Sequence, residues 1–371
     1  KGSAMTTTTA AVVESGGAAF TLSPVQLGEP RSGEVRVRIV AAGLCHTDLG
    51  VAAGGLPFPL PGVLGHEGAG VVEAIGPGVT GVQEGDHVLL SFTSCGTCGN
   101  CRAGHPAYCA TWLPLNLIGG ARADGSSPIT RNGTALGGHF FGQSSFANHA
   151  IVDERSLVRV DSSAPLEILA PLGCGVQTGV GAVWNVLRPR PGDTVVVTGA
   201  GAVGLSAIMA AALTPAAKII AVDRVAERLE LATELGATHV VDATREDTAA
   251  ALAELTEGSG VDGAIETTGN VGVLRTAIDA LAPRGTAVVV GAPPFGTEVP
   301  VDVNAMLPGR RIVGLTLGDS ETQTLIPVLV DLVVSGRLPL QRLITHYRFD
   351  DINSAVADMI SGASIKPVLL F

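Results

Sequence analysis

The chain has 371 residues, a formal net charge of −11 at pH 7 and a hydrophobic fraction of 46%. This length exceeds the usual limit for one hydrophobic core, so we expect two domains, one of which can interrupt the other in sequence. The acidic balance disfavours nucleic acid and anionic membrane surfaces as partners. The 49 glycines and the low aromatic content are typical of an α/β protein.

The compartment is predicted from the ends of the chain and from its cysteines. Residues 1–4 precede Met5 and resemble the remnant of an expression tag, and no secretory signal follows them. All six cysteines lie in contexts typical of metal sites, so none remains for a disulfide framework. We therefore expect a cytoplasmic protein. Residues 194–217 are uncharged and long enough to cross a bilayer, but their glycines and Pro215 predict strand, turn and helix, so no membrane partner is expected.

The first ninety residues carry the pattern of short strands. Val35, Val37 and Ile39 alternate with Arg36 and Arg38, as in a strand with one buried face. Two further strand-like runs, separated by turn residues, continue this pattern at residues 68–76 and 85–90. These observations predict a small β-rich domain.

Two motifs in this domain, Gly43–Asp48 and Gly65–Glu67, carry candidate metal ligands. Cys45 offers a thiolate and His66 an imidazole, which are ligand types that zinc prefers, and Cys174 offers a third donor. Such a set leaves one tetrahedral position open, where a metal binds an alcohol and lowers the pKa of its hydroxyl. The alternative treats each residue as an ordinary buried side chain, which is the better reading for any one of them alone.

A second cysteine set follows, with the spacing Cys95-x2-Cys98-x2-Cys101-x7-Cys109. Four thiolates this close in sequence can fill all four positions around a zinc ion, which makes the metal structural. A redox role for the CxxC pairs and an iron–sulfur cluster are the alternatives. We interpret the set as a zinc site because it lies in a polar loop with no redox fold around it.

Residues 111–145 are predicted to be a long loop that carries apolar side chains. Trp112, Leu115, Leu117, Phe140 and Phe141 either fill the core of the domain or wall a pocket, and a long loop in a compact domain is usually functional. Strand signals return at residues 146–160. Residues 166–186 have a helical pattern that includes Cys174 and Thr178.

A strand at residues 194–198, the glycine turn Gly199-Ala-Gly201-Ala-Val203-Gly204 and a helix at 205–213 then predict a dinucleotide site. The first glycine permits the tight turn, the second lets a pyrophosphate approach the backbone, and the third lets helix and strand pack closely. A buried strand ending at Asp223 follows, and this acid suits a ribose diol. A structural βαβ unit without a ligand is the alternative.

Helices and strands alternate from residue 225 to residue 290, which predicts a doubly wound parallel sheet with helices on both faces. Another strand signal lies at 312–317, and a helix is expected at 322–334. Strands at 344–347 and 366–371 are assigned to the first domain.

Taken together, these motifs resemble the zinc-dependent medium-chain alcohol dehydrogenases over Met5–Phe371. The resemblance implies a GroES-like catalytic domain, residues 5–182 and 319–371, interrupted by a Rossmann NAD-binding domain, residues 183–318. It implies two zinc ions per chain, NAD as cofactor, a small alcohol or aldehyde as substrate, and a homo-oligomer, either dimer or tetramer. It also implies reversible oxidation of the alcohol, with hydride passing to the nicotinamide.

The predicted catalytic residues take their roles from the same resemblance. Asp48 is expected to accept a hydrogen bond from the second ring nitrogen of His66, fixing its tautomer, and Glu67 to lie behind the zinc. Thr47 is expected to take the substrate's hydroxyl proton. His46, predicted to lie in a loop, faces the cofactor pyrophosphate.

The other assigned residues contact the cofactor or the substrate. The predicted substrate pocket includes Phe92, Leu115 and Phe140. The predicted NAD-binding residues, besides His46, are Thr178, Gly199, Gly201, Val203, Gly204, Asp223, Arg224, Arg228, Gly291 and Lys366, of which Lys366 is expected at the pyrophosphate.

One position departs from the family, and one run indicates a branch of it. Gly50 stands where well-studied relatives carry a histidine at the outer end of the proton relay, so the later path of the proton is open. The run Phe140–Ala147 and residues 124–126 resemble the bacterial aryl-alcohol (benzyl alcohol) dehydrogenases, which implies primary aromatic or allylic alcohols as substrates. Two alternatives are a thiol-adduct formaldehyde dehydrogenase and a non-enzymatic protein on this fold. Proteins of the second kind usually lose zinc ligands, and all three are retained here.

Overall fold

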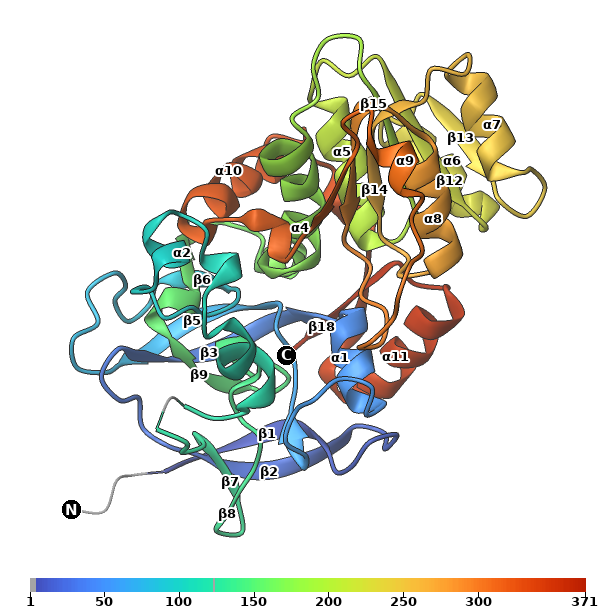
Figure 1. The fold of residues 1–371 in the computed structure, drawn as a ribbon. Coiled ribbons are helices and arrows are strands. Elements are labelled where there is room, and N and C mark those ends of the chain that lie inside the picture. The colour runs from blue at the N-terminus through green and yellow to red at the C-terminus, as the bar shows by residue number, and fades with distance from the viewer. Residues whose placement is uncertain (1–4, 123) are drawn as a thin grey trace. The chain divides into compact units, whose positions relative to one another are not determined.

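The computed structural model describes residues 5–122 and 124–371, which form two compact units (Figure 1). The first unit contains the described residues up to Cys174 together with Glu321–Phe371, and the second is Gly175–Ser320. The predicted boundaries lay at 182/183 and 318/319. The structure assigns the helix α4 (Gly175–Gly181) to the second unit, because α4 packs against α5 (Ala202–Ala212) so closely that a Cβ on Gly179 would lie 2.2 Å from the carbonyl oxygen of Val203.

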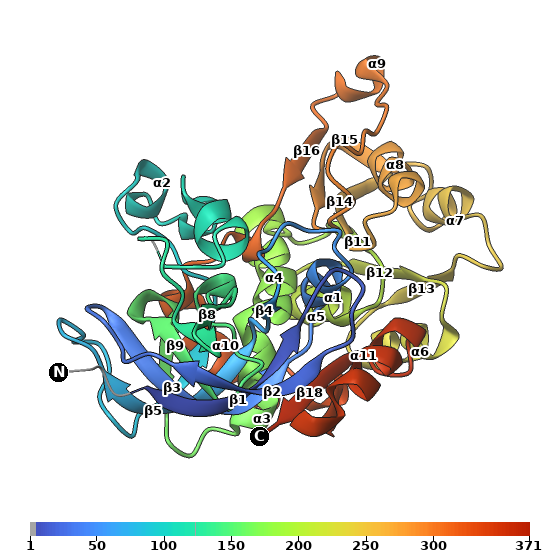
Figure 2. The same cartoon turned by 90° about the horizontal axis from the view of Figure 1, so that it is seen from below.

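The first unit contains two sheets. In the five-stranded sheet the order is β4-β1-β2-β7-β8, and in the other it is β10-β6-β5-β3-β18-β17, with β9 also paired to β3. Figure 2 shows β1 and β2 side by side, as their antiparallel register requires. The strands are β1 (Thr6–Val13), β2 (Thr21–Leu27), β3 (Glu34–Gly43), β4 (Gly62–Val63), β5 (Gly68–Ile75), β6 (His87–Leu90), β7 (Ile129–Arg131), β8 (Thr134–Ala135), β9 (His149–Asp153), β10 (Leu157–Val160), β17 (Ile344–Arg348) and β18 (Lys366–Leu370).

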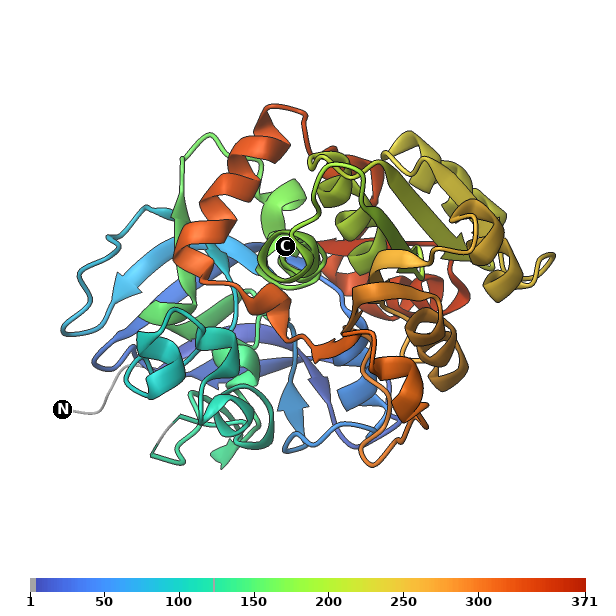
Figure 3. The same cartoon turned by 45° about the horizontal axis from the view of Figure 1, so that its top comes forward.

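Short helices connect these strands, and two longer ones follow near the end of the chain. Helix α10 packs against β10 and is the orange-red helix in Figure 3. The α-helices of this unit are α1 (His46–Ala52), α2 (Gly99–Arg102), α3 (Leu166–Leu169), α10 (Thr322–Val334) and α11 (Ile352–Ser361). The helical turns are η1 (Pro106–Tyr108), η2 (Pro114–Ile118), η3 (Phe140–Gly142), η4 (Glu154–Ser156), η5 (Ala170–Gly173), η8 (Leu340–Arg342) and η9 (Phe349–Asp351).

The predicted strand through Val35, Val37 and Ile39 is confirmed as β3. All three side chains are buried, whereas Arg36 is half-buried and Arg38 exposed. This alternation is the period of two that a pleated strand imposes on its side chains. The side chains of β3 therefore face inward and outward in the order that the sequence predicts.

Two expectations for the first unit were wrong, and one helix was not predicted. The long loop expected at residues 111–145 contains the hairpin of β7 and β8, which joins the sheet because Ile129 pairs with Leu27 of β2. The loop expected at His46 is helix α1, which begins after Cys45 in a capping box with Asp48. Helix α11 was not predicted, although apolar residues with helical spacing lie between Ile352 and Met359 and are buried.

The second unit is built on six parallel strands in the order β13-β12-β11-β14-β15-β16. The order reverses at β11, so right-handed crossovers place α5 and α6 on one face and α7 and α8 on the other. This confirms the doubly wound sheet. Its elements after α4 are η6 (Ala182–Leu187), β11 (Thr194–Thr198), α5, β12 (Lys218–Asp223), α6 (Ala226–Glu234), β13 (His239–Asp242), α7 (Thr248–Leu255), β14 (Val261–Glu266), α8 (Val271–Asp279), β15 (Leu281–Val289), α9 (Val303–Met306), β16 (Arg311–Gly314) and η7 (Leu317–Asp319).

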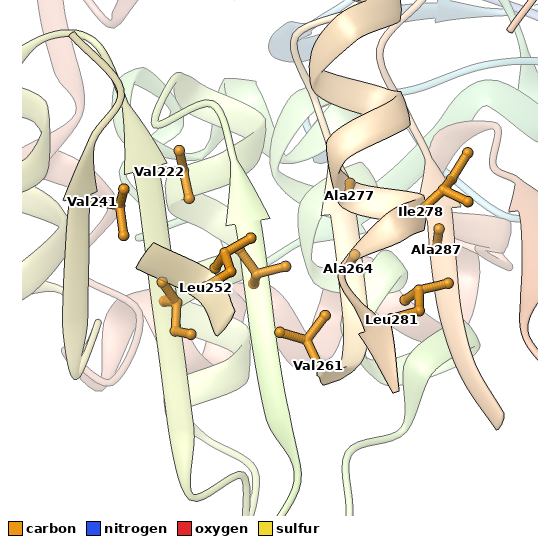
Figure 4. Packing of buried hydrophobic residues seen from close by; sticks show 11 residues of the cluster. Val222, Val241, Leu252, Val261, Ala264, Ala277, Ile278, Leu281 and Ala287 are labelled. Carbon is orange, nitrogen blue, oxygen red and sulfur yellow. The ribbon is translucent and has the colours of Figure 1, made fainter. Parts of the chain in front are cut away.

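One hydrophobic cluster of this unit lies between the sheet and helices α7 and α8. Figure 4 shows Leu252 of α7 and Ile278 of α8 packed over the strands, together with Val222, Val261 and other buried apolar residues. The uncharged stretch at 194–217 is β11 followed by α5. Among the described residues no single helix is long and apolar enough to span a membrane, and one bent pair, Leu166–Gly173 with Gly175–Leu187, meets that test by length and composition alone.

Candidate metal centres and cofactor site

The three predicted ligands of the open metal site come together in the first unit. Cys45 caps α1, His66 lies between β4 and β5, and Cys174 follows η5. Their donor atoms, with one carboxylate oxygen of Glu67, all lie within 4.8 Å of one another. His66 is 1% exposed, yet its Nε2 has no hydrogen-bond partner among the described residues. An unpaired nitrogen buried among thiols fits a metal ion, because the metal supplies the partner that the protein lacks.

Asp48 fixes the orientation of His66, as predicted, and also that of Cys45. Its Oδ1 accepts a hydrogen bond from Nδ1 of His66 at 3.0 Å and another from the backbone N–H of Gly65 at 3.0 Å. Its Oδ2 accepts from the backbone N–H of Cys45 at 2.9 Å, and the side chain is fully buried. Because Nδ1 is held by the carboxylate, Nε2 is the ring nitrogen that remains for a metal.

The two cysteines of this set divide one proton between them. A hydrogen bond from Cys174 lowers the pKa of Cys45 well below its ordinary value, although burial acts in the opposite direction. The same hydrogen bond and burial raise the pKa of Cys174. These shifts favour the thiolate at Cys45 and the thiol at Cys174, and a metal ion requires both sulfur atoms as thiolates.

Lys366 does not lie where the sequence analysis placed it. The side chain is 2% exposed, and its Nζ donates to both carboxylate oxygens of Glu67 at 3.0 and 2.8 Å and to the carbonyl oxygen of Leu44 at 3.0 Å. The prediction that Lys366 faces a pyrophosphate is wrong, because all three of its N–H donors are used inside the first unit. Glu67 does lie beside the metal ligands, as expected.

Aromatic rings enclose the imidazole of His66. Phe141 stacks on it with ring centroids 4.4 Å apart, and Phe140 meets it edge-on at 5.3 Å. Phe58 packs against Phe140, and Trp112 against Phe141. Of the two readings of these apolar residues, filling of the core is correct for Phe140 and Phe141. Phe140 is 0% exposed, so the structure places it behind the ligand and not on a pocket surface.

The other two predicted pocket residues are Leu115 and Phe92. Leu115 is half-buried in η2. Phe92 is 3% exposed and borders a mostly polar cavity of about 150 Å³ beside the cysteine lobe. The residues that line this cavity are Phe92, Ser94, Gly96, Cys101, Pro106, Arg155, Glu321, Thr322 and Gln323.

The predicted closed site is also assembled in the first unit. The sulfur atoms of Cys95, Cys98, Cys101 and Cys109 lie within 4.8 Å of one another, and none of the six cysteines, all of which the structure describes, forms a disulfide. Backbone N–H groups point at the sulfurs, for example that of Cys98 toward Sγ of Cys95 at 3.3 Å. Such hydrogen bonds lower the pKa of Cys95 to about 5, which favours the thiolate that a metal requires. Four thiols around one point fit a zinc ion with no open position.

In the second unit, the predicted cofactor residues gather at the carboxyl ends of the parallel strands. Gly199 follows β11 with φ of 93°, a conformation that glycine adopts without strain. A Cβ on Gly201 would meet nothing within 4 Å, whereas a Cβ on Gly204 would lie 1.7 Å from the carbonyl oxygen of Gly199. These are the three roles predicted for the glycines: a tight turn, an open approach to the backbone, and close packing of helix on strand.

Asp223 ends β12 beside this turn. Its carboxylate accepts hydrogen bonds from the backbone N–H groups of Ala200, Arg224 and Val225 at 2.6, 2.7 and 2.9 Å. The acid therefore ties the second strand to the glycine turn, with one lone pair left on Oδ2. Arg224 is exposed, and Nε of the half-buried Arg228 has no hydrogen-bond partner among the described residues.

The remaining predicted residues are divided between the two units. Thr178 lies on α4, Val203 on α5 and Gly291 after β15, all in the second unit. In the first unit, His46 is exposed at the start of α1. The hydroxyl oxygen of Thr47 lies 3.8 Å from Sγ of Cys45, so it is close to the metal ligands.

Comparisons with known proteins agree with both halves of this arrangement. Residues 31–162 match the family model of the alcohol dehydrogenase GroES-like domain, and residues 202–332 match that of the zinc-binding dehydrogenases. The chain is 43% identical to a geraniol dehydrogenase of Castellaniella defragrans over 363 residues, covering 98% of this chain and 97% of that protein. This chain belongs to the zinc-binding medium-chain alcohol dehydrogenases.

Solved structures extend this likeness to three dimensions. An alcohol dehydrogenase zinc-binding domain protein from Burkholderia ambifaria is similar with a TM-score of 0.96 and 50% identity, covering 99% of this chain and 100% of that one. The benzyl alcohol dehydrogenase of Acinetobacter calcoaceticus is similar with a TM-score of 0.95 and 45% identity, covering 99% of both chains. The GroES-like and Rossmann domains of the family are thus present in this alcohol dehydrogenase.

The sequence analysis missed the residues that hold the metal-ligand segment of this dehydrogenase in place. Gln143 is 1% exposed and donates to the carbonyl oxygens of His66 and Ser91, while its Oε1 accepts from the N–H of Gly68. Ser144 donates to the carbonyl oxygen of Val63 at 2.7 Å. Polar residues flanked by phenylalanines in the run 140–147 were the available signal, because a polar side chain in an apolar run must find partners.

A second omission lies in the cofactor domain. Glu266 ends β14, is 1% exposed, and accepts hydrogen bonds from the backbone N–H groups of Thr268 and Gly269. Thr267 donates to the carbonyl oxygens of Thr198 and Gly199 at 2.8 and 3.1 Å, joining the end of β14 to the glycine turn. An acidic residue at the end of a buried strand, followed by two threonines, was the signal for this support.

Proposed function

We propose that the chain is an NAD-dependent alcohol dehydrogenase with two zinc ions, which interconverts primary aromatic or allylic alcohols and their aldehydes. The observation that carries the proposal is the buried set of Cys45, His66 and Cys174, in which Nε2 of His66 has no other partner. Three protein ligands leave one tetrahedral position for the substrate oxygen. The four-cysteine lobe supports a second, structural zinc ion.

When bound, zinc supplies a Lewis acid that lowers the pKa of the alcohol hydroxyl, and the nicotinamide accepts the hydride. The part of the protein in this step is to hold the ligands and to remove the proton. Thr47, whose hydroxyl lies beside Sγ of Cys45, accepts the hydroxyl proton of the substrate as it gives up its own. Gly50 lies on α1 and offers no side chain to carry the proton further, so we propose that water receives it.

The preference for NAD is supported by Asp223. A carboxylate at the end of β12 can accept hydrogen bonds from the ribose hydroxyls and repels a 2′-phosphate. The neighbouring Arg224 is exposed and could instead pair with that phosphate. Because the acid is present and ordered by three backbone hydrogen bonds, we propose at least about a tenfold preference for NAD, or about 1.4 kcal/mol.

The proposed substrate class is supported by the relatives. One is a geraniol dehydrogenase and another a benzyl alcohol dehydrogenase, so both act on primary alcohols whose hydroxyl-bearing carbon is next to an unsaturated carbon. An unsaturated neighbour stabilises positive charge at the carbon that loses hydride. The rings around His66 add an apolar, polarisable wall behind the metal ligand.

The test is NADH formation from benzyl, cinnamyl, terpenoid and short saturated alcohols, with NAD or NADP as cofactor. We expect kcat/KM for benzyl and allylic alcohols to exceed that for saturated alcohols of equal length. Cinnamyl alcohol and 3-phenylpropan-1-ol form a matched pair, because they differ only in the double bond. Equal efficiency with both would contradict the proposed substrate class. Turnover of formaldehyde only in the presence of a thiol would favour the thiol-adduct enzyme instead.

A further inference from the structure

Glu67 is a fourth candidate ligand in a site that needs only three. One of its carboxylate oxygens lies within 4.8 Å of the donor atoms of Cys45, His66 and Cys174. Carboxylate oxygen is an ordinary zinc ligand, and four protein donors are the usual number in a closed, structural site. If Glu67 bound the metal, the position required for the substrate oxygen would be filled.

The protein holds the Glu67 carboxylate in a separate set of contacts. Lys366 donates to both of its oxygens, at 3.0 and 2.8 Å, and uses its third N–H on the carbonyl oxygen of Leu44. Glu67 is 0% and Lys366 2% exposed, so water does not compete for these bonds. The carboxylate also fills the space at Gly43, where a Cβ would lie 2.0 Å from Oε2. The absence of a side chain at residue 43 therefore leaves room for the carboxylate in its contact with Lys366.

The charges of the site explain why a cation is needed here. Two thiolates and the carboxylates of Glu67 and Asp48 carry four negative charges, and a divalent ion neutralises only two of them. Lys366 adds one further positive charge, within direct hydrogen-bond distance of the Glu67 carboxylate. A buried carboxylate without this partner would be left unpaired at a large cost, and the nearest positive charge would be the metal itself.

We propose that Lys366 is a positioning residue that keeps the Glu67 carboxylate off the metal and thereby keeps the fourth coordination position open. The inference rests on the proposed function, because it requires a metal at Cys45, His66 and Cys174. In this proposal Lys366 limits the protein ligands of the metal to three, whereas the sequence predicted a contact between Lys366 and the cofactor. No bond is made or broken in the substrate by either residue.

The test uses protein in which cobalt(II) replaces zinc and measures imidazole binding by the change in the visible spectrum. Imidazole is a suitable monodentate probe, because it is a ligand type that cobalt accepts, and the closed four-cysteine site has no position for it. The variants are Lys366→Met, which removes the charge and keeps the chain length similar, and Lys366→Arg, which keeps the charge. The double variant with Glu67→Gln and Lys366→Met removes both partners of the buried pair.

We expect Lys366→Met to bind imidazole at least about tenfold more weakly than wild type, the usual size of an effect from residues that support metal ligands. Lys366→Arg should stay close to wild type, and the double variant should recover binding, because an amide does not replace imidazole on the metal as a carboxylate does. If Lys366→Met does not fold, Lys366→Gln takes its place with the same expectation.

Two results would overturn different parts of the account. Wild-type imidazole binding retained by Lys366→Met, or a double variant as weak as Lys366→Met, would show that Glu67 is not the competing ligand and would overturn this inference alone. A wild-type cobalt protein with no response to imidazole would mean that no open metal position exists, which contradicts the proposed function itself. Because the readout is a spectrum, neither result depends on finding the right alcohol.

Discussion

Replacing Asp48 with asparagine is the sharpest test of how the metal ligands are held. The carboxylate accepts three hydrogen bonds, from Nδ1 of His66, the N–H of Gly65 and the N–H of Cys45, and is fully buried. An amide has the same shape but only one acceptor oxygen. In either orientation it therefore turns an N–H group toward an N–H group of the protein.

The magnitude depends on which side the amide nitrogen takes. If it faces Cys45, a buried N–H loses its acceptor, which costs about 1 to 3 kcal/mol. If it faces His66, Nδ1 must act as the acceptor, and the ring proton moves to Nε2, the atom required by the metal. In either orientation the cost arises next to a metal ligand. We therefore expect the zinc affinity of this site to fall about 10- to 100-fold, or about 1.4 to 2.7 kcal/mol.

The assay is competition between the protein and a coloured zinc chelator, with the two metal sites resolved by their rates of release. Asp48→Asn should lose the zinc held by Cys45, His66 and Cys174 at lower chelator concentration, while the four-cysteine site stays unchanged. Asp161→Asn, the same substitution at an exposed aspartate far from these ligands in sequence, is the matched control. Zinc affinity within about twofold of wild type in Asp48→Asn would refute the reasoning, since supporting residues usually contribute more than that.

Four further predictions follow from the same structure. Thr47→Ala should lose about two to four orders of magnitude in kcat, and Thr47→Ser much less, because serine keeps the hydroxyl that accepts the proton. Pre-steady-state NADH formation measures the loss, and nearly full activity in the alanine variant would contradict the role of Thr47. Asp223→Asn should raise the ratio of kcat/KM with NADP to that with NAD, and an unchanged ratio would show that the acid does not select the cofactor. Cys98→Ala should remove one zinc ion, lower the Tm and promote aggregation, and a variant with unchanged Tm and zinc content would contradict a structural metal there. Burial lowers the pKa of His139 below its ordinary value of 6.5, so near and below pH 6.5 the unfolded chain binds a proton that the folded chain does not. The stability of the fold should therefore decrease as pH drops below about 6.5. His139→Asn should reduce the change in Tm between about pH 7.5 and 5.5, and an equal change in Tm in wild type and variant would contradict this.

The metal ligands and the glycine turn were predictable because the residues that define each motif lie close together in the sequence. Cys45, His66 and the four-cysteine run are recognisable from ligand type and spacing alone. The roles of Gly199 and Gly204 follow from backbone geometry that only glycine provides at those positions. In each case the residue type admits few alternatives, so local sequence is sufficient.

The errors concern partners that are distant in sequence or periodicity that was overlooked. Lys366 lies 299 residues from Glu67, and nothing in its own neighbourhood shows that its ammonium group is buried against that carboxylate. Phe140 was assigned to a pocket because an aromatic residue in a loop can serve either purpose, and only packing shows that it supports His66. The spacing of the apolar residues from Ile352 to Met359 predicts helix α11, so its omission was avoidable.

The central claim is that one metal site is open for chemistry and the other is closed. The most direct measurement is zinc content and NADH formation from benzyl alcohol and NAD on the same samples of wild type and Cys174→Ala. The account predicts two zinc ions per chain and NADH formation in wild type, and one zinc ion, an unchanged fold and no NADH formation in the variant. Activity retained in Cys174→Ala, or an active wild type with a single zinc ion, would contradict it.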